Sequence, residues 1–431
     1  MDPTHWAYKG EGNANLVLSY IGPVAALMGR VLRLRKATDD DLDASEPSPF
    51  TLDYEIGFQR HVIAPLLGAE YVAPADLVDV SPAFLEEISR RVSAARPPGR
   101  RSRPLDLSQP HAALIKDWTY VPQRRDGKAV TTIAVEIKPK WGFLPTSPLI
   151  APEHAVKRRT CRYCMHQQWK AKVAATAQKP PHAAAHDGHV ANTFCPLDLY
   201  SRNRARVRAA FDALLPNPQN NLRLFVDGQP TLLDSDQARK TLAEQFQAGA
   251  ANAMDTLFEH LTSILISDNL LPRLQQHQRG LDPHDIEGVF PLYEAMPEAQ
   301  RTAVPTLNEW RETIDTYCAN ANAQRSDEEN RPLFAASAKA TREYLVSATL
   351  KDCSVIITLW LESSGAQSPP TAPNEGMIPL PDSPDGDLLR YRIGVLDVDP
   401  KRAAKIPAHF TLDRDIVEHY IETGIEKLCQ E

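Results

Sequence analysis

Two acidic positions late in the chain have the residue types and the placement needed to move a phosphoryl group. Asp352 comes directly before an apolar run, and Asp397 and Asp399 follow a later apolar run at residues 388–396. Phosphoryl transfer needs one carboxylate to orient or deprotonate the attacking hydroxyl and another to hold Mg²⁺ on the phosphates. We therefore predict Asp352 as the catalytic base, Asp397 as a magnesium ligand and Asp399 as a second ligand. A plain surface turn is the alternative for Asp397-Val398-Asp399.

A second pattern of charged residues ends an earlier strand, in the sequence Glu136-Ile137-Lys138-Pro139-Lys140. Residues two apart in a strand share a face, so Glu136 and Lys138 point the same way, and Pro139 ends the strand before Lys140. Lysine suits phosphate as a compact positive charge, and two lysines this close suit a substrate with several phosphates. The alternative is a solvent-facing edge strand with a salt bridge.

A glycine-rich loop stands near the start of the chain, at Gly10-Glu11-Gly12-Asn13-Ala14, and runs directly into an apolar strand. Glycine has no Cβ, so the backbone N–H groups of such a loop can approach phosphate oxygens. Because a strand follows and not a helix, the arrangement is typical of a kinase loop rather than of a dinucleotide-binding fold. A simple turn would have the same composition.

Three of the six cysteines are spaced as metal ligands are. Cys161 and Cys164 form a C-x-x-C pair, His166 follows, and Cys195 comes later in the chain. Zinc favours such sets, so we predict a structural Zn²⁺ site at these four residues, with reduced buried thiols as the alternative. Three histidines in the intervening segment could substitute: His182, His186 and His189.

The composition limits the class of protein. A chain of 431 residues with 42% hydrophobic and 24% charged residues is long enough for two lobes, and its apolar runs are too short for a membrane helix. A formal net charge of −7 argues against nucleic acid as the main partner. Basic clusters at residues 96–103, 124–128 and 157–162 could still make one cleft positive for a compact polyanion. We expect a monomeric intracellular protein, nuclear or cytoplasmic, without membrane insertion.

The elements that must position these residues predict an α+β fold. Short strands dominate up to about residue 140, and helical periodicity dominates after residue 145. We therefore predict an N-lobe with a mixed or antiparallel sheet at residues 1–145 and a larger, helix-rich C-lobe at residues 146–431. The later segments are predicted as helices at 202–215, 236–270 and 333–350, strands at 355–361 and 388–396, and an exposed loop at 363–387.

Several longer strings in the chain carry a family resemblance. They are Gly10-Glu11-Gly12-x-Ala14-Asn15-Leu16-Val17-Leu18, Glu136-Ile137-Lys138-Pro139-Lys140-x-Gly142-Phe143-Leu144-Pro145, Cys161-Arg162-Tyr163-Cys164-Met165-His166-Gln167, Pro196-Leu197-Asp198-Leu199, Gln219-Asn220-Asn221-Leu222-Arg223, Asp285-Ile286-Glu287-Gly288, Ala348-Thr349-x-Lys351-Asp352-Cys353-Ser354 and Leu396-Asp397-x-Asp399. In this order they resemble the signatures of the inositol-pentakisphosphate 2-kinase family.

The resemblance implies a two-lobed kinase-like fold that uses ATP and Mg²⁺ to phosphorylate inositol 1,3,4,5,6-pentakisphosphate at its 2-hydroxyl, giving inositol hexakisphosphate. It implies an ATP site made of Gly12, Asn13, Ala14, Asn15, Arg33, Asp117, Glu136, Lys138, Arg223 and Asp397. It implies a substrate site made of Arg100, Lys138, Lys140, Lys170, Asn220, Asn221, Lys401 and Lys405. Lys138 would also act catalytically beside Asp352, by balancing charge on the moving phosphoryl group.

The chain departs from the family pattern at a few positions. Thr38 stands where plant members carry a phosphate-binding arginine, and Lys405 stands near a position where they carry another. Plant members also have a zinc site further along the chain, but only Cys318 stands in the corresponding region, so we expect that site to be absent.

Two other functions remain open from the sequence. The first is a catalytically inactive inositol polyphosphate receptor or scaffold, which would bind without turnover and should lack Asp352 or Asp397. The second is a kinase for another small molecule or for proteins. The missing His-Arg-Asp and Asp-Phe-Gly strings argue against a protein kinase.

Overall fold

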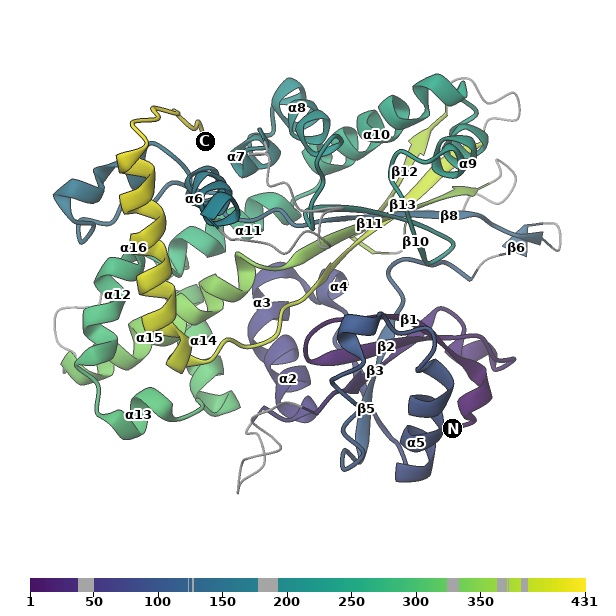
Figure 1. Cartoon of the computed structure of the whole chain (residues 1–431), viewed down its shortest axis with the longest axis horizontal. Coiled ribbons are helices and arrows are strands. Elements are labelled where there is room, and N and C mark those ends of the chain that lie inside the picture. The colour runs from purple at the N-terminus through teal and green to yellow at the C-terminus, as the bar shows by residue number, and fades with distance from the viewer. Residues whose placement is uncertain are drawn as a thin grey trace. The chain divides into compact units, whose positions relative to one another are not determined.

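The computed structural model describes residues 1–37, 50–122, 124–125, 128–176, 193–323, 333–362, 370, 372–380 and 387–431. Helices and strands are mixed along the chain (Figure 1), and the strands Trp6–Glu11, Asn15–Tyr20, Arg30–Arg35 and His111–Lys116 pair antiparallel in this order, so the predicted α+β class is confirmed. Thr38 and the three histidines at positions 182, 186 and 189 lie outside the described residues.

The chain divides into two compact units, each built from three segments. Unit 1 contains Met1–Val135, Leu224–Ala250 and Ile356–Gly394, and unit 2 contains Glu136–Arg223, Ala251–Val355 and Val395–Glu431. The lobe bounds given above, residues 1–145 and 146–431, stay a prediction.

The strands form two larger sheets and one short hairpin. A five-stranded sheet has the order β1 (Trp6–Glu11), β2 (Asn15–Tyr20), β3 (Arg30–Arg35), β5 (His111–Lys116), β4 (Asp76–Asp79). A six-stranded sheet has the order β10 (Gln229–Thr231), β9 (Leu222–Val226), β8 (Thr132–Ile137), β11 (Ser354–Glu362), β13 (Leu388–Leu396), β12 (Glu375–Pro379). The hairpin pairs β6 (Arg124–Arg125) with β7 (Lys128–Ala129).

The α-helices of the described residues follow in chain order. They are α2 (Leu52–Phe58), α3 (Ala64–Leu67), α4 (Ala69–Val72), α5 (Pro82–Val92), α6 (Arg162–Thr176), α7 (Pro196–Tyr200), α8 (Arg204–Leu214), α9 (Asp236–Phe246), α10 (Ala253–Ser267), α11 (Leu270–Gly280), α12 (Asp285–Glu294), α13 (Glu298–Thr302), α14 (Leu307–Ala323), α15 (Leu333–Leu350) and α16 (Ile406–Glu422). None of these described helices combines the length and apolar character that a membrane span requires.

Alternation along the first strands explains the core of the five-stranded sheet. The leucines at alternate positions of β2 and β3 are buried against the apolar face of α5, which begins where Ser81 accepts a hydrogen bond from the Phe84 N–H. The opposite face of β3 carries Arg33 and Arg35, and both bind the Glu55 carboxylate, at 3.0 and 3.1 Å. The two arginines therefore share one face of β3, as residues two apart in a strand do.

One predicted loop contains a strand. The segment 363–387 was expected to be exposed and irregular because it is rich in proline, but Glu375–Pro379 forms β12 and pairs with β13 at the edge of the sheet. An edge strand needs a hydrogen-bonding partner on one side only, so a short segment that ends in proline can still pair. The predicted strand 388–396 is confirmed with the same bounds.

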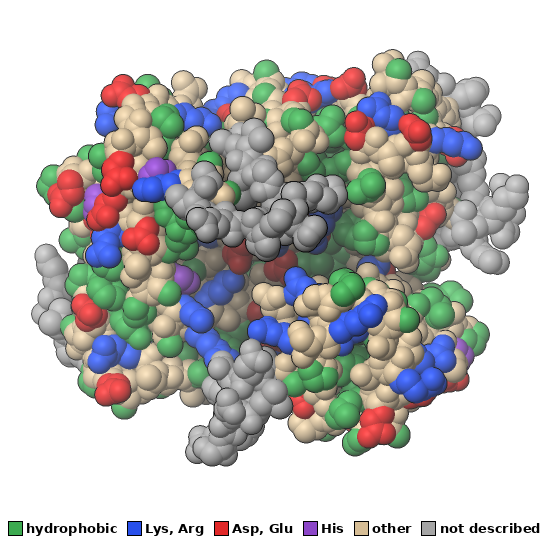
Figure 2. Space-filling view, in the orientation of Figure 1, with side chains coloured by type: hydrophobic (Ala, Val, Ile, Leu, Met, Phe, Trp, Pro, Cys, Tyr) green, Lys and Arg blue, Asp and Glu red, His purple; other side chains and the backbone are tan. Residues whose placement is uncertain are grey.

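In unit 2, α16 packs against α6 and α12, and α12 packs against α15. Figure 1 shows α16 in yellow along α12, α15 and α6. Met165 of α6 is buried with Ile416, Val417 and Tyr420 of α16, which holds these two helices together. The visible face of the described residues carries acidic and basic side chains interspersed (Figure 2), so the negative net charge is not gathered there.

Candidate active site

The hydroxyl of Ser354 is the centre of a charged cluster in unit 2. Lys138 Nζ donates to Ser354 Oγ at 2.9 Å and lies 2.9 Å from Asp397 Oδ2. Ser354 Oγ also lies 2.8 Å from Glu136 Oε1 and 2.9 Å from Asp397 Oδ2, so its single proton is shared between two carboxylates. The ends of β8, β11 and β13 thus bring together Glu136, Lys138 and Asp397, as the sequence predicted.

The charges in this cluster hold Lys138 in its protonated form. Its side chain is only 14% exposed, and burial alone would lower its pKa. The carboxylates of Asp397, Glu136 and Asp352 outweigh burial and hold the pKa of Lys138 above its ordinary value. Lys138 is therefore a fixed positive charge beside two acidic groups, which suits a developing phosphoryl charge.

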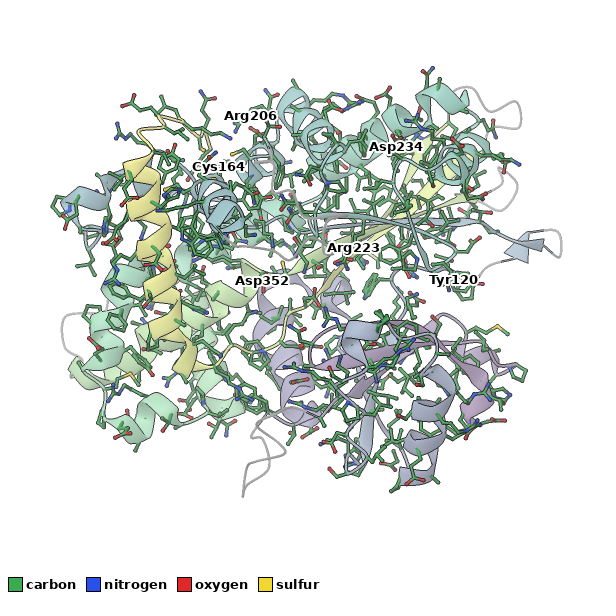
Figure 3. The ribbon with its side chains drawn as sticks, in the orientation of Figure 1. Tyr120, Cys164, Arg206, Arg223, Asp234 and Asp352 are labelled. Carbon is green, nitrogen blue, oxygen red and sulfur yellow. The ribbon has the colours of Figure 1, made fainter. Side chains whose placement is uncertain are left out.

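Asp352 presents its carboxylate to the same cluster from the turn after α15. Its side chain is 59% exposed, with Lys401 Nζ at 3.1 Å and Lys140 Nζ at 4.0 Å from its oxygens. Figure 3 shows Asp352 at the end of α15 and Arg223 on β9. Arg223 reaches Glu136 Oε2 at 3.6 Å. A carboxylate that is accessible and held between two lysines is suited to accept a proton from a bound hydroxyl.

Left-handed backbone conformations recur at this site. Lys140 and Asp397 have φ of 60° and 59°, and Gln219, directly before the predicted amide pair, has φ of 48°. Such conformations are costly for residues other than glycine and persist where the surrounding structure enforces them. At Lys140 the carbonyl is fixed by hydrogen bonds from Tyr200 Oη and Gln278 Nε2, at 3.1 and 3.0 Å.

A cavity of about 330 Å³ opens beside Asp352, entirely within unit 2. Its lining combines cations with amides and aromatic rings: Lys140, Trp141, Arg162, Tyr163, His166, Lys170, Asn220, Asn221, Ile286, Tyr344, Ala348, Lys351, Asp352, Lys401, His409, Leu412 and Asp413. The amide Nδ2 of Asn221 donates to the Tyr163 hydroxyl at 2.8 Å, which fixes one part of the wall.

Burial and the repulsion of neighbouring cations act on the lysines of the cavity. Burial lowers the pKa of Lys140, Lys170 and Lys351. Lys138 and Lys170 lower the pKa of Lys140 further, and Arg162 lowers that of Lys170. Like charges held together at a partly desolvated surface form a binding site for a multiply charged anion.

The cavity floor is built on buried ion pairs. The ammonium of Lys351 lies 3.9 Å from the centre of the Trp141 ring and 2.5 Å from Asp282 Oδ2. Nearby, Lys157 Nζ binds Asp413 at 2.8 Å and Glu287 at 3.0 Å. These contacts connect α12 and α16 to the segment before α6.

The glycine loop lies in unit 1 and is anchored through its central acid. Glu11 accepts hydrogen bonds from Lys36 and Arg96, at 2.7 and 2.8 Å. Burial alone would raise the pKa of Glu11, but these hydrogen bonds lower it to about 2. A Cβ added at Gly10 or Gly12 would meet no described atom within 4 Å, so the space beside the loop is open. An anchored loop with open glycines fits the predicted cradle for nucleotide phosphates.

The remaining residues of the predicted ATP site in unit 1 have their own partners. Arg100, which was predicted to bind substrate, donates from Nη1 to Asn13 Oδ1 at 2.5 Å. Arg33 binds a carboxylate on α2, and Asp117 is paired with Lys9 at 2.8 Å. Ala14 accepts a hydrogen bond at its carbonyl, and Asn15 begins β2. Their roles toward ATP and substrate stay predictions.

Two further predicted residues flank the cluster in unit 2. The carbonyl of Asp399 accepts a hydrogen bond from Thr349 Oγ1 at 3.2 Å, and Lys405 stands on the 3₁₀ helix Ala403–Lys405, outside the described lining of the cavity. Among the residues of the site to which sequence reasoning assigned no role are Trp141, Tyr344, Lys351, Ser354 and His409. Lys351 and Ser354 lie close to Asp352 in one sequence string, and this proximity to the predicted base could have identified them.

The predicted zinc set is corrected by the structure. Four buried cysteines have sulfur atoms that all lie within 4.8 Å of one another: Cys161, Cys164, Cys195 and Cys429. His166 is not in this group. Its ring packs 5.6 Å from that of Trp169 and lines the cavity. The fourth thiol comes from the C-terminal segment, where the Cys429 N–H donates to the Arg159 carbonyl at 2.9 Å.

The geometry of the thiol cluster fits a metal ion. Four sulfurs around Zn²⁺ at about 2.3 Å lie about 3.8 Å apart, and Cys161 and Cys195 have their sulfurs 3.9 Å apart. All four cysteines are free thiols. Hydrogen bonds from Cys161 lower the pKa of the Cys164 and Cys429 thiols, whereas the hydrogen bonds within the cluster raise the pKa of Cys161, so the thiolate form that binds metal is favoured at part of the cluster. Figure 3 shows Cys164 on α6 beside the C-terminal segment.

Comparison with known proteins agrees with the geometry of the site. The family model described as inositol-pentakisphosphate 2-kinase matches residues 8–415. A rice relative, named inositol-pentakisphosphate 2-kinase IPK1, is 30% identical over 98% of this chain and 95% of its own length. Relatives named inositol-pentakisphosphate 2-kinase from Arabidopsis thaliana and Danio rerio are 28% and 26% identical over 97% and 98% of this chain, and over 94% of their own lengths. The chain therefore belongs to the inositol-pentakisphosphate 2-kinase family.

Proposed function

We propose that this protein transfers the γ-phosphoryl group of ATP to the 2-hydroxyl of inositol 1,3,4,5,6-pentakisphosphate and produces inositol hexakisphosphate. The observation that carries the proposal is the cavity of about 330 Å³, in which several lysines and an arginine surround one accessible carboxylate, Asp352. A substrate with five phosphate groups needs such a concentration of positive charge. The names of the relatives support the same substrate and position.

In this proposal each residue of the cluster has one task. Asp352, held by Lys401 and Lys140, accepts the proton of the attacking hydroxyl. Lys138 balances the negative charge that develops on the transferred phosphoryl group. The amides of Asn220 and Asn221 bind substrate phosphates at the cavity wall.

Magnesium would be held by Asp397, with Asp399 as a second ligand. Carboxylate oxygens are the ligands that Mg²⁺ prefers, and the Asp397 side chain is 60% exposed and accessible to a metal-bound nucleotide. An ion held there would neutralise the charge of the nucleotide phosphates. Ser354 and Lys138 keep the Asp397 carboxylate in one orientation.

The test is incubation of the protein with ATP, Mg²⁺ and a panel of inositol phosphates, with the products resolved by anion exchange. Inositol 1,3,4,5,6-pentakisphosphate should be converted to hexakisphosphate faster than any other member of the panel is phosphorylated. Binding of the pentakisphosphate without any product would instead support the inactive receptor. Preferred phosphorylation of a different inositol phosphate would contradict the proposed substrate.

We further propose that the four-cysteine cluster holds a structural Zn²⁺. The cluster joins the start of α6, the segment before α7 and the C-terminal segment. Because α6 also contributes Arg162, Tyr163 and Lys170 to the cavity, the metal would fix a wall of the substrate site. The expected monomeric state and intracellular location also stay predictions.

Native mass spectrometry tests the metal directly. The wild-type protein should carry one Zn²⁺, and Cys429→Ser should lose it, because one thiolate of the four is removed. Cys318→Ser is the matched control, since Cys318 lies on α14 outside the cluster. Wild-type protein purified without stoichiometric metal, or a Cys429→Ser variant that keeps it, would contradict this site.

A further inference from the structure

Two imidazoles line the substrate cavity, those of His166 on α6 and His409 on α16, and neither has a task in the chemistry described so far. His409 stands in the first turn of α16 and lines the cavity with Lys401, Arg162 and Lys351. Its Nδ1 atom lies 3.3 Å from the hydroxyl oxygen of Tyr344 on α15, which orients the ring. A ring nitrogen in this position can donate to a phosphate oxygen.

We propose that His409 is a substrate-binding residue that takes up a proton when the inositol polyphosphate enters the cavity and then binds a phosphate group as a cation. The inference rests on the proposed function, because the ligand is the proposed substrate. It adds a residue to the substrate site and a dependence of affinity on pH.

The surroundings keep the imidazole neutral while no anion is present. Burial lowers the pKa of His409 to about 4, and the positive charges of Lys401, Arg162, Lys351 and Lys405 act in the same direction. These charges come from α6, from the turn after α15 and from the segment before α16.

The acidic groups on the packed helices are already engaged by other cations. On its own helix, Asp413 is bound by Arg162 and Lys157. The acids of α12, Asp285 and Glu287, also bind Lys157. Asp352, from the turn after α15, lies between Lys401 and Lys140. With these acids paired, the charges that act on His409 are those of the surrounding cations, and they add to the effect of burial.

A bound polyphosphate reverses this balance, because its phosphates neutralise the cations that disfavour the imidazolium. Burial raises the pKa of Tyr344, so the phenol keeps its proton and can donate it to Nδ1 of the neutral ring. One proton from solvent then adds to the Nδ1 lone pair, and Nδ1–H donates to the Tyr344 oxygen. The Tyr344 hydroxyl, which no longer donates to Nδ1, can then donate its proton to a phosphate oxygen. The Nε2–H group of His409 is a second donor.

Isothermal titration calorimetry measures this proton directly. Inositol hexakisphosphate is titrated without ATP at pH 7.5, in two buffers with different ionisation enthalpies, into wild type, His409→Gln, His409→Arg and His419→Gln. His419 is the matched control, because it lies on α16 outside the cavity lining. The two His409 variants should take up about one proton fewer per bound ligand than wild type does. The His419→Gln control should take up as many protons as wild type.

The pH dependence gives a second readout. As the pH falls from about 8 to 6.5, the Kd of wild type should fall relative to that of His409→Gln by up to about tenfold per pH unit, as linkage to one proton requires. His409→Arg, which is always charged, should bind tightly without this pH dependence. Equal proton uptake by wild type and His409→Arg overturns the proposal even if His409→Gln does not fold. Failure of wild type to bind the ligand would instead overturn the proposed function.

Discussion

At the scale of single residues, the position of Asp352 separates binding from turnover. The carboxylate is accessible and lies among lysines, so in the proposed mechanism it accepts a proton, whereas the cavity cations would provide affinity. Asp352→Asn keeps the size of the side chain and removes its basicity. The value of kcat should fall by a factor of roughly 10² to 10⁴. The Kd of the inositol phosphate should stay the same or decrease, because a negative charge leaves a basic site.

Kinetics of turnover combined with calorimetry of ligand binding check this prediction. Turnover within a few fold of wild type would show that Asp352 is not the base. A large loss of affinity would show that it contributes mainly to the structure of the cavity.

Ser354 allows a second prediction at this scale, because one hydroxyl orients Glu136, Lys138 and Asp397. Ser354→Ala should leave two carboxylates without that hydrogen bond, and each hydrogen bond to a charged group contributes about 1.5–3 kcal/mol. We expect kcat to fall by roughly ten- to a hundredfold and the Mg²⁺ concentration for half-maximal rate to rise. Ser347→Ala is the control, since the hydroxyl of this buried serine donates to the Gln278 carbonyl.

A titration of the reaction rate against Mg²⁺ concentration for both variants tests whether Ser354 orients Asp397. If Ser354→Ala loses stability as Ser347→Ala does but keeps the wild-type Mg²⁺ dependence, then Ser354 has no role in orienting Asp397.

At the scale of elements, a network of buried ions joins α12 and α16 to the segment before α6 and supports the cavity. Burial raises the pKa of Asp285 from 3.8 to about 6, and the nearby Asp413 and Asp282 carboxylates raise it further against the attraction of Lys157. A carboxyl whose folded-state pKa is raised contributes stability below its unfolded pKa, and that contribution is lost as the pH rises through the folded value. The difference of about two pKa units between the folded and unfolded states corresponds to a change of at most about 3 kcal/mol in the free energy of unfolding.

Asp285→Asn tests this network, because asparagine tolerates the φ of 60° found at this position and cannot ionise. The free energy of unfolding of wild type, relative to the variant, should decrease between pH 4 and pH 7. Urea unfolding across this range measures the difference. Asp315→Asn, an exposed change on α14, should show no such trend. A difference that does not vary with pH would mean that Asp285 is ionised throughout.

At the scale of the whole molecule, the sequence predicted those features that depend on short patterns. The apolar run predicted as a strand after the glycine loop forms β2, and the residues of the strand-end strings, Lys138, Asp397 and Asp352, lie at one site. Cys429 could not be found this way, because it joins the other three cysteines only through the packing of the C-terminal segment. Ser354 and His409 were missed for a related reason: their chemistry arises from partners on other elements.

The division of functions between the two units leads to the last prediction. All residues that line the cavity beside Asp352 belong to unit 2, whereas the glycine loop belongs to unit 1. Inositol hexakisphosphate should therefore raise the midpoint of thermal unfolding without any nucleotide. At a ligand concentration of about 100 times Kd the stabilisation would be about 2.7 kcal/mol.

Two variants distinguish the contributions of the units in the same thermal assay. Gly12→Val places a side chain in the open space beside the loop, so it should weaken ATP binding and leave the shift by inositol hexakisphosphate unchanged. Lys140→Met removes a cation from the cavity and should reduce that shift while ATP binding persists. A shift that requires nucleotide, or that Gly12→Val abolishes, would mean that unit 1 takes part in binding the inositol phosphate. Affinity for the polyanion would then depend on both units, and the cations of the cavity alone would not account for it.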